Sequence, residues 1–307
     1  MSDSRNLRQV FADKFTSLAD KDKKLVVVVG DISHGIFSKL RSNHPDRYYN
    51  IGIHEQSMMS VGAGLSKSGM IPVIHTIGSF LIERSYEQIK LDFGYQNLSG
   101  NLISVGSAFD YSALGCTHHC YTDFMLLKTL PNSEIFYPGS PKELEKQIEL
   151  SYNNNKLTLF RISGNTHNNE FKFNKKNFKK IIKIKNGNKL TVICTAPFLK
   201  SIQEIINKNK LNNKIDFLYV NCIKPLDKET IKKSILKTKN ILLVEDHLES
   251  GGIYEDLIKI ALKNKVSRLH NINIPKNFIR TYGSYNDIIK TIGMDKLSIE
   301  KIIKKLV

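Results

Sequence analysis

Several features that would indicate a secreted or membrane protein are missing from this chain of 307 residues. The N-terminus lacks the basic and then apolar pattern of a signal peptide, and no apolar run reaches the ~20 residues that a membrane helix needs. Only four cysteines occur, and they form neither a C-x-x-C pair nor a regular zinc spacing. We therefore expect a cytoplasmic protein with reduced thiols, no membrane contact and no metal ligands of its own.

Acidic residues are also scarce. The chain has 29 Asp and Glu against 46 Lys and Arg, which gives a formal net charge of +17. Such an excess raises the question of nucleic-acid binding. The lysines are spread out, however, and in the densest run, residues 172–185, they interleave with Phe and Ile. This alternation favours an exposed connector with one apolar side, so we expect no nucleic-acid partner; a basic surface could equally attract phosphorylated sugars.

Apolar runs and helical patterns alternate along the first half of the chain. Leu25–Val29 is a continuous, mostly β-branched run, which is typical of a strand buried on both faces of a parallel sheet. Such an alternation predicts an α/β fold whose parallel sheet is covered on both faces. We expect further strands at 70–76, 102–105, 134–136 and 157–162, and helices at 4–20, 121–130 and 141–152.

A polar stretch rich in Asn and Lys, residues 165–188, separates two parts of the chain. Within it we place a linker at 171–188, so that residues 1–170 form the first α/β domain. The alternation then restarts, and residues 189–307 are expected to form a second, smaller α/β domain. Its expected strands are 190–194, 215–220, 241–244 and 268–274, and its expected helices are 198–208, 228–237, 252–263 and 295–307.

The stretch from Tyr48 to Gly69 joins a strand end to a helix rich in small residues, and Glu55 lies at the junction. A carboxylate between apolar neighbours is costly to bury unless a partner meets it. Two interpretations are open: an acid that is favoured at a helix N-terminus, or a buried acid that shares a proton with a ligand. The spacing alone favours the first.

The loop that follows Leu25–Val29 carries two further polar candidates, Asp31 and His34. Ligands of open α/β sheets bind at the carboxyl ends of strands, which is where this loop lies. A turn or capping role is the more common function of an aspartate in such a place.

Three motifs together resemble those of thiamine-diphosphate enzymes. N-I-G-I-H-E-Q at 50–56 precedes a Gly- and Ala-containing helix and then I-P-V-I-H-T-I-G-S-F at 71–80. Downstream, G-C-T-H-H at 115–119 leads to Asp123 and to L-P-N at 130–132. In this order the motifs resemble the pyrimidine-binding domain of transketolase. V-E-D-H at 244–247, followed by G-G at 251–252, is similar to the C-terminal domain of that family, so the resemblance covers nearly the whole chain.

The resemblance implies a cofactor, thiamine diphosphate, and residues that would bind it. Glu55 would be the carboxylic acid that hydrogen-bonds the aminopyrimidine and stabilises its imino form. Phe80 would stack on that ring, with Ile53 and Asp31 also in contact with the cofactor. The segment F-L-I-E-R-S-Y-E-Q is one residue longer than a related pattern, which leaves its register open. Tyr86 is the alternative aromatic, although ordinary core packing is the better interpretation for it.

The resemblance also implies substrate contacts. His118 would face the reacting carbon and move protons near neutral pH. Arg161 would hold a substrate phosphate, with a salt bridge as the alternative. His34 would also contact the substrate. His75 is expected to be a structural histidine.

The sequence departs from transketolase in two ways. Gly106 and Leu114 stand where transketolases have a histidine and an acid that read sugar hydroxyls, which suggests a modified or nucleotide-linked sugar. Transketolases hold the cofactor diphosphate through a divalent metal with G-D-G and, further downstream, N-N. This chain has Gly30-Asp31-Ile32, without the third glycine, and no asparagine pair at the matching place. We therefore expect a separate N-terminal, diphosphate-binding subunit that holds most of the Mg²⁺ site, in an α₂β₂ heterotetramer.

The predicted function is transfer of a two-carbon ketol unit between sugars or sugar phosphates. Alternatives within the same cofactor class are a deoxyxylulose-phosphate-synthase-like protein and the beta subunit of a 2-oxo acid dehydrogenase. A non-catalytic basic binding protein on an old enzyme fold is a third possibility, which an intact Glu55 and His118 disfavour.

Overall fold

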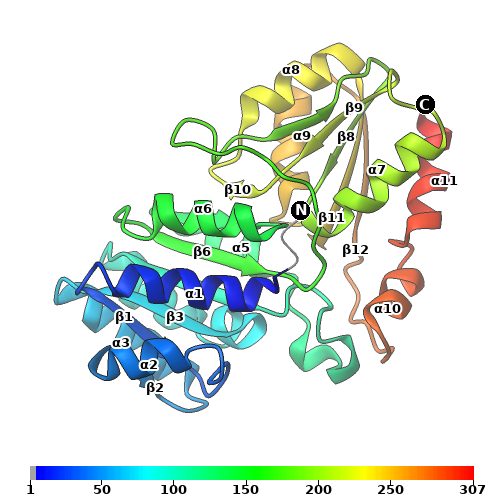
Figure 1. Ribbon diagram of the computed structural model, residues 1–307. Helices are drawn as coiled ribbons and strands as arrows, with labels where there is room; N and C mark the ends of the chain where they lie inside the picture. The colour runs from blue at the N-terminus through cyan, green and yellow to red at the C-terminus, as the bar shows by residue number, and fades with distance from the viewer. Residues whose placement is uncertain (1–4) are drawn as a thin grey trace.

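The structure is a computed structural model that describes residues 5–307. Residues 1–4, which include the first residue of the helix expected over 4–20 and the start of the expected first domain, lie outside the described part. Two sheets organise the chain, and helices cover both faces of each (Figure 1). No helix within residues 5–307 is both long enough and apolar enough to span a membrane.

The first sheet has seven strands in the order β10-β5-β6-β4-β3-β1-β2. All neighbours are parallel except β10, which runs antiparallel to β5. The strands are β1 (Leu25–Val29), β2 (Tyr48–Asn50), β3 (Ile71–Ile77), β4 (Gly100–Val105), β5 (Ser133–Phe136), β6 (Leu157–Ile162) and β10 (Cys222–Lys224).

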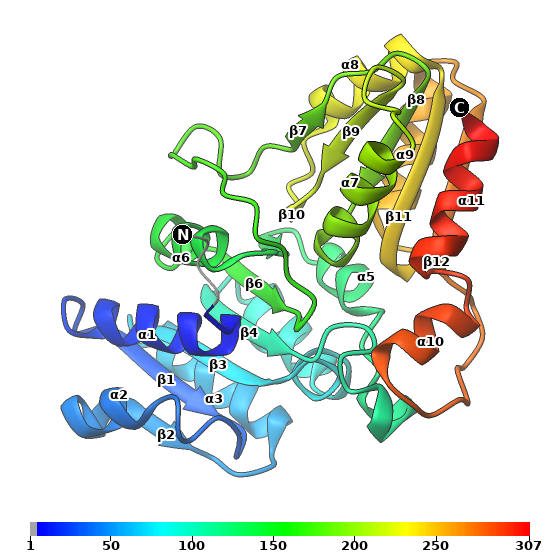
Figure 2. The same ribbon diagram turned by 45° about the vertical axis from the view of Figure 1, so that its right-hand side comes forward.

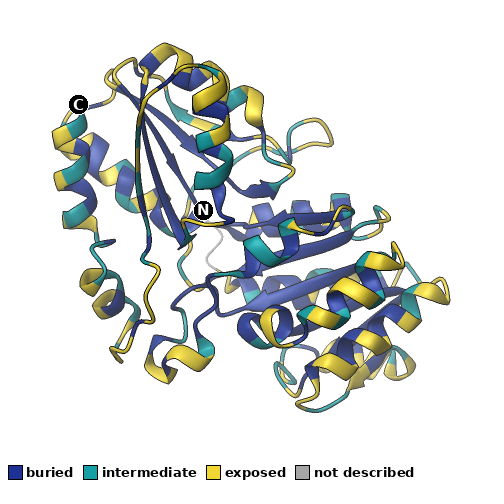
Figure 3. Ribbon diagram, turned by 180° about the vertical axis from the view of Figure 1, so that it is seen from behind, coloured by how far each residue is buried: buried dark blue, intermediate teal, exposed yellow. Residues whose placement is uncertain are grey.

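Strand β1 shows why this sheet lies between helix layers. Val27 and Val29 pack in one core cluster with α1 (Leu7–Ala19) and α6 (Pro141–Ser151). Val26 and Val28 point to the other face, where α3 (Glu55–Lys67) packs. Alternate residues of a strand face opposite sides, so an unbroken apolar run requires both sides to be covered. The prediction that this strand is buried on both faces is confirmed. Figure 3 shows the strands of the sheet mainly in dark blue, the colour of buried residues.

The second sheet has five strands in the order β12-β11-β8-β9-β7. Helices α7 (Leu199–Lys208) and α11 (Lys296–Leu306) lie on one face, and α8 (Lys228–Thr238) and α9 (Ile253–Lys263) lie on the other (Figures 1 and 2). The predicted α/β class with two sheets is confirmed. The strands are β7 (Ile182–Lys185), β8 (Leu190–Cys194), β9 (Ile215–Tyr219), β11 (Asn240–Leu248) and β12 (Arg268–Ile274).

Two short strands cross the expected division of the chain. Strand β7 lies inside the linker expected at 171–188, and it pairs antiparallel with β9, so the second sheet begins before residue 189. Strand β10 lies in the range expected for the second domain, yet it extends the first sheet beside β5. Strands of four and three residues give too little pattern for assignment to a sheet from sequence.

The segment between β3 and β4 is helical in an unusual way. Ser79–Arg84 and Ile89–Tyr95 are π-helical and flank a short α4 (Tyr86–Gln88). A π-turn holds one residue more than an α-turn. Such turns can therefore accommodate the extra residue noted in F-L-I-E-R-S-Y-E-Q. The other helices, α2 (Ser38–Asn43), α5 (Asp123–Lys128) and α10 (Tyr285–Thr291), are short.

Candidate active site

Glu55 is the first residue of α3, and only 1% of its surface is exposed. Its charge has a partner, because Arg84 Nη1 donates to Glu55 Oε2 at 2.8 Å. The Arg84 side chain remains 37% exposed, so the ion pair reaches from the interior to the surface. The N-terminus of α3 also favours a negative charge at this place. The structure therefore contains both features considered from sequence: a helix-terminal acid and a buried acid that needs a partner.

Arg84 links Glu55 to two other predicted residues. Its guanidinium lies over the Phe80 ring, 4.0 Å from the ring centroid, which is a cation–π contact. The Phe80 ring in turn lies 5.0 Å from the His118 ring, at an interplanar angle of 69°. Glu55, Phe80 and His118 thus form one cluster, although they lie far apart in the sequence. Tyr86 lies elsewhere, with its hydroxyl 2.6 Å from Thr129 Oγ1.

Arg84 itself was not predicted as a site residue. The signal available in the sequence was its spacing of four residues from Phe80 in a helical segment, which places both on one face. The ion pair with Glu55 depends on the packing of the π-helical segment against α3, and sequence periodicity does not show that packing.

His118 lies at the end of a short 3₁₀ turn, Cys116–His118, and is half-buried. Its Nδ1 is 2.9 Å from Thr117 Oγ1. Partial desolvation lowers the pKa of His118, and the nearby Arg84 charge adds to the effect. The imidazole is therefore mainly neutral near pH 7, which suits a group that accepts and returns protons.

The loop that carries His118 needs glycine at position 115. Gly115 has a φ of +76°, and a Cβ there would lie 2.4 Å from the ring of Tyr282. Tyr282 belongs to the second half of the chain, so a segment that precedes α10 covers the G-C-T-H-H loop. From the other side, Ser79 Oγ donates to the Thr117 carbonyl at 3.2 Å.

Asp31 and His34 form a separate polar group at the end of β1. His34 Nε2 is 2.9 Å from Asp31 Oδ1, and Asn50 Nδ2 donates to the same oxygen at 3.0 Å. The hydrogen bond from Asn50, followed by that from His34, lowers the pKa of Asp31. Within residues 5–307 no hydrogen bond or ion pair joins this group to Glu55, Phe80 or His118. These contacts account for Asp31 as a turn residue, with a φ of +53°.

Ile53, the remaining residue expected at the cofactor, is 66% exposed just before α3. Its apolar side chain lies outside the core. It therefore requires contact with a ligand or another chain if it is to be buried.

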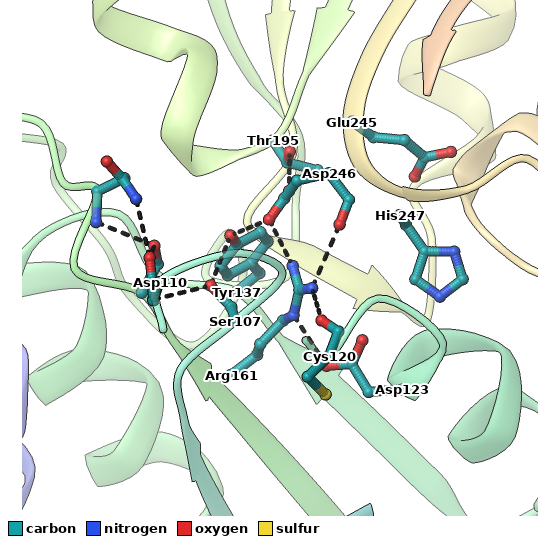
Figure 4. A network of polar contacts seen from close by, with 12 residues as sticks. Ser107, Asp110, Cys120, Asp123, Tyr137, Arg161, Thr195, Glu245, Asp246 and His247 are labelled. Atoms are coloured by element: carbon teal, nitrogen blue, oxygen red, sulfur yellow. Dashed lines mark hydrogen bonds and ion pairs between the residues drawn. The ribbon is translucent and has the colours of Figure 1, made fainter. Parts of the chain in front are cut away.

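Arg161 is not available to a substrate, which corrects the prediction that it holds a phosphate. Its side chain is 0% exposed, and Nε donates to Asp123 Oδ2 at 2.8 Å while Nη1 donates to Asp246 Oδ2 at 2.9 Å. Nη2 donates to the Cys120 carbonyl at 3.0 Å (Figure 4). Two carboxylates and a carbonyl use the fork that a phosphate would need. The salt-bridge alternative is the correct one.

The V-E-D-H segment meets this ion pair from the second sheet. Asp246 binds Arg161, and the rings of His247 and Phe124 stack 4.9 Å apart. Glu245 accepts from the backbone N–H groups of Ile253 and Tyr254 at the start of α9, and burial raises its pKa to about 7. The segment is therefore a joint between the two sheets and a helix cap, not part of the Glu55 cluster.

The Glu55 cluster fits an aminopyrimidine. It supplies a buried carboxyl group and, beside it, an aromatic face in Phe80. The planar Arg84 guanidinium lies on that face and pairs with Glu55, so it contacts both groups that would hold an aminopyrimidine. Among the residues that the structure describes, no group of three or more His, Cys, Asp or Glu side chains is arranged to hold a metal ion.

Comparisons with known proteins agree with this geometry. The family described as "Transketolase, pyrimidine binding domain" matches residues 3–167, and "Transketolase, C-terminal domain" matches residues 179–299. The chain belongs to the transketolase family. The predicted family resemblance is thereby confirmed, and with it the enzyme class, a thiamine-diphosphate-dependent transferase of the transketolase type.

Individual transketolase relatives show how much of the chain is shared. One of the subunits of apulose-4-phosphate transketolase from Actinobacillus succinogenes is 30% identical over 262 residues, which are 82% of each chain. An uncharacterised 33.6 kDa protein in the fasciation locus of Rhodococcoides fascians is 29% identical over 240 residues, 78% of this chain and 75% of that one. The 1-deoxy-D-xylulose-5-phosphate synthase of Clostridium perfringens is 28% identical over 83% of this chain but only 42% of its own length.

Solved transketolase structures share the fold. A chain described as a split gene transketolase, inactive beta4 tetramer, superposes with a TM-score of 0.83 at 19% identity, over 98% of this chain and 97% of that one. Transketolase from Campylobacter jejuni superposes with a TM-score of 0.81 at 16% identity, over 97% of this chain and 46% of that one.

Proposed function

We propose that this chain is the pyrimidine-side subunit of a two-subunit, transketolase-like enzyme that transfers a two-carbon ketol unit between sugars. The observation that carries the proposal is the placement of Glu55: a buried acid at the start of α3, in one cluster with Phe80 and His118. The relative from Actinobacillus succinogenes is itself named as one subunit of a transketolase, which supports the division of the enzyme into two chains.

Each residue of the cluster has a role in this proposal. Bound thiamine diphosphate supplies the nucleophilic carbon. Glu55 holds a proton at the edge of the pyrimidine ring, and Phe80 offers its face for stacking. His118 exchanges protons with substrate hydroxyl groups, which its lowered pKa allows near neutral pH. Ile53 contacts the cofactor, and Asp31 and His34 line the rim of the site.

Arg84 must leave the Phe80 face when the cofactor binds. Its outward side is exposed, so the side chain can turn into solvent or toward a partner without disturbing the core. Until then the guanidinium satisfies the buried Glu55 charge, which would be costly to leave alone.

A second chain completes the site in this proposal. Large apolar side chains are exposed on α3 and on the segments around it, where a partner could cover them. These are Tyr49, Ile53, Val61, Leu91 and Tyr95. The partner is the diphosphate-binding subunit, which carries most of the Mg²⁺ site, and the assembly is an α₂β₂ heterotetramer in the cytoplasm. The four free cysteines support that compartment. For the domains we propose 1–170, a linker at 171–188 whose strand β7 belongs to the second sheet, and 189–307, from which β10 extends the first sheet.

Reconstitution tests the proposal. The chain is mixed with a diphosphate-binding partner encoded in the same genome, thiamine diphosphate and Mg²⁺, and ketol transfer from an unphosphorylated ketose and from its phosphate ester is followed. We expect transfer by the pair and none by either chain alone. Tight cofactor binding and turnover by this chain alone would refute the two-chain proposal, whereas an inactive pair would refute ketol transfer.

A further inference from the structure

A pocket of about 180 Å³ opens at the carboxyl ends of β4 and β6, and one of its lining residues, Tyr111, lies near His118 of the Glu55 cluster. Its wall includes Arg8, Gly106, Asp110, Tyr111, Ser163 and Gly164. The Tyr111 ring lies 6.1 Å from the ring of His118, so the pocket is a few carbon–carbon bonds from the proposed reaction centre. Carboxyl ends of parallel strands are the usual place for ligands in such sheets.

Tyr111 fills the space above Gly106. Gly106 has a φ of +82°, and a Cβ there would lie 2.3 Å from Tyr111 Cε2, so no larger residue fits while the ring keeps this position. Gly106 is the position at which transketolases have a histidine. In this chain a phenol borders the pocket instead, and burial raises the pKa of Tyr111, so its hydroxyl stays neutral.

Four hydrogen-bond donors near the end of β6 bind the Asp110 carboxylate. The Gly164 N–H donates to this carboxylate at 2.9 Å, and Asn165 Nδ2 donates at 2.8 Å. The Ser163 hydroxyl donates at 3.1 Å, and the Ser107 hydroxyl donates at 3.3 Å (Figure 4). A backbone N–H, an amide and two hydroxyls that converge on one point would also suit an external anion such as a phosphate.

The described lining of the pocket has no net positive charge, although it includes Arg8. Among the described residues that line this pocket Arg8 is the one cation. Burial raises the pKa of Asp110 to about 6, so this carboxylate balances Arg8 at pH 7 and above. Arg8 Nη2 already donates to Ser33 Oγ at 2.7 Å, and Ser33 Oγ lies 2.9 Å from Nε2 of the buried His75. The donors that would bind a phosphate in this pocket are therefore already bound to the Asp110 carboxylate. The negative charge of that carboxylate would also repel the phosphate.

We infer that Asp110 acts as a built-in anion that occupies this donor set, so that the pocket accepts the uncharged, hydroxyl-bearing end of a sugar and rejects a terminal phosphate. Asp110 and Tyr111 are then the specificity-determining residues for the end of the substrate remote from the reacting carbon. The location of the reacting carbon in this inference rests on the proposed ketol transfer. The occupation of the four donors by Asp110 does not depend on that proposal.

The first test uses the full chain without partner or cofactor. Asp110→Ala removes the carboxylate and leaves the four donors free, Asp110→Asn keeps the shape and removes the charge, and Asp13→Asn on exposed α1 is the matched control. Inorganic phosphate is titrated while the Gly164 amide is followed by NMR with ¹⁵N-glycine labelling. We expect no response in the unaltered chain or in Asp13→Asn, and a saturable shift in Asp110→Ala. Phosphate binding by the unaltered chain at Gly164, or none by folded variants at Asp110, would overturn the inference.

The second test uses the reconstituted pair. The kcat/KM for D-fructose is compared with that for D-fructose 6-phosphate as ketol donors. The unaltered enzyme should prefer fructose, and Asp110→Asn should shift the ratio toward the ester by about tenfold or more, mainly through KM. The ratio for Asp13→Asn should not change. An active pair that prefers the ester contradicts the inference and leaves ketol transfer standing. If neither sugar is a donor but the phosphate titration behaves as expected, the proposed function fails and the occupied anion site stands.

Discussion

Three buried ionisable side chains, Glu55, Arg161 and His75, differ in how exposed their hydrogen-bond partners are to solvent. Glu55 is paired with an arginine that is partly exposed, so the partner can move away when a ligand arrives. Arg161 is enclosed with both of its carboxylates and has no such freedom. His75 is a third case, because it is buried in its neutral form: Nδ1 donates to the Ile103 carbonyl at 2.9 Å, and Nε2 then accepts from Ser33. Only the first arrangement suits a ligand site.

His75 should make the fold sensitive to acid. Burial lowers its pKa to about 4 from an ordinary 6.5. Between these values the unfolded chain holds more protons than the native one, so stability is present above pH 6.5 and is lost as the pH falls toward 4. Replacing His75 by Asn should reduce the loss of unfolding free energy between pH 7 and pH 5 by about 2 kcal/mol. Urea unfolding at the two pH values measures this.

His54, which is exposed, provides the matched control for His75. His54→Asn should keep the pH dependence of the unaltered chain. If His75→Asn and His54→Asn lose stability equally between the two pH values, the buried neutral histidine is not the cause.

Helix α3 shows what the small residues of an element do. Gly62 and Ala63 are buried against the first sheet, whereas Ser60 and Gly64 lie on the exposed side. The small residues allow a close approach to the sheet, which is seen at Gly62, where a Cβ would lie 2.3 Å from Ile74 Cδ1. The packing sets the position of Glu55, which begins the same helix.

Substitution at the two glycines of α3 should have opposite effects. Gly62→Val introduces side-chain atoms into a filled space, and we expect a loss of about 1–3 kcal/mol of unfolding free energy. Gly64→Ala meets open space and improves helix propensity, so it should gain roughly 0.5–1 kcal/mol. Thermal or urea unfolding of the two variants measures both effects. Equal effects at the two positions would show that α3 does not pack as described.

The elements that the sequence predicts well are those with long, regular patterns. β1, β6 and β8 begin and end where their apolar runs do, because each is buried along its whole length. Strand β10 has three residues and joins the sheet of the other half, which no local pattern reveals. Arg161 was misassigned for a related reason. Arg161 forms an ion pair with Asp246, which is 85 residues away in the sequence and comes close only when the two sheets pack together.

A buried network of charges around Arg161 joins the two sheets of the molecule. Arg161 on β6 binds Asp123 at the start of α5 and Asp246 on β11. Tyr137 donates to Asp246 at 2.6 Å, and Thr195 donates to it at 2.9 Å. Strand β10 adds a second connection beside β5. We expect the two halves to unfold together, since a single buried charge network holds them.

Removal of the Arg161 charge should break this coupling. Arg161→Met leaves two buried carboxylates without their cation, and we expect a loss of about 3–5 kcal/mol of unfolding free energy. Differential scanning calorimetry should show one transition for the unaltered chain and two for the variant. Arg268→Met, at an exposed position of β12, is the matched control and should change little. A small effect of Arg161→Met with one transition would mean that the network does not hold the halves together.

Glu55 is proposed to keep the pyrimidine ring of bound thiamine diphosphate in its reactive tautomer. The most direct measurement is the rate of deuterium exchange at the thiazolium C2 position in the reconstituted, cofactor-loaded pair. Glu55→Gln should slow this exchange by roughly 10²-fold or more, while Glu229→Gln, on the exposed side of α8, should leave it unchanged. Exchange at the unaltered rate in a folded, cofactor-binding Glu55→Gln pair would contradict the account.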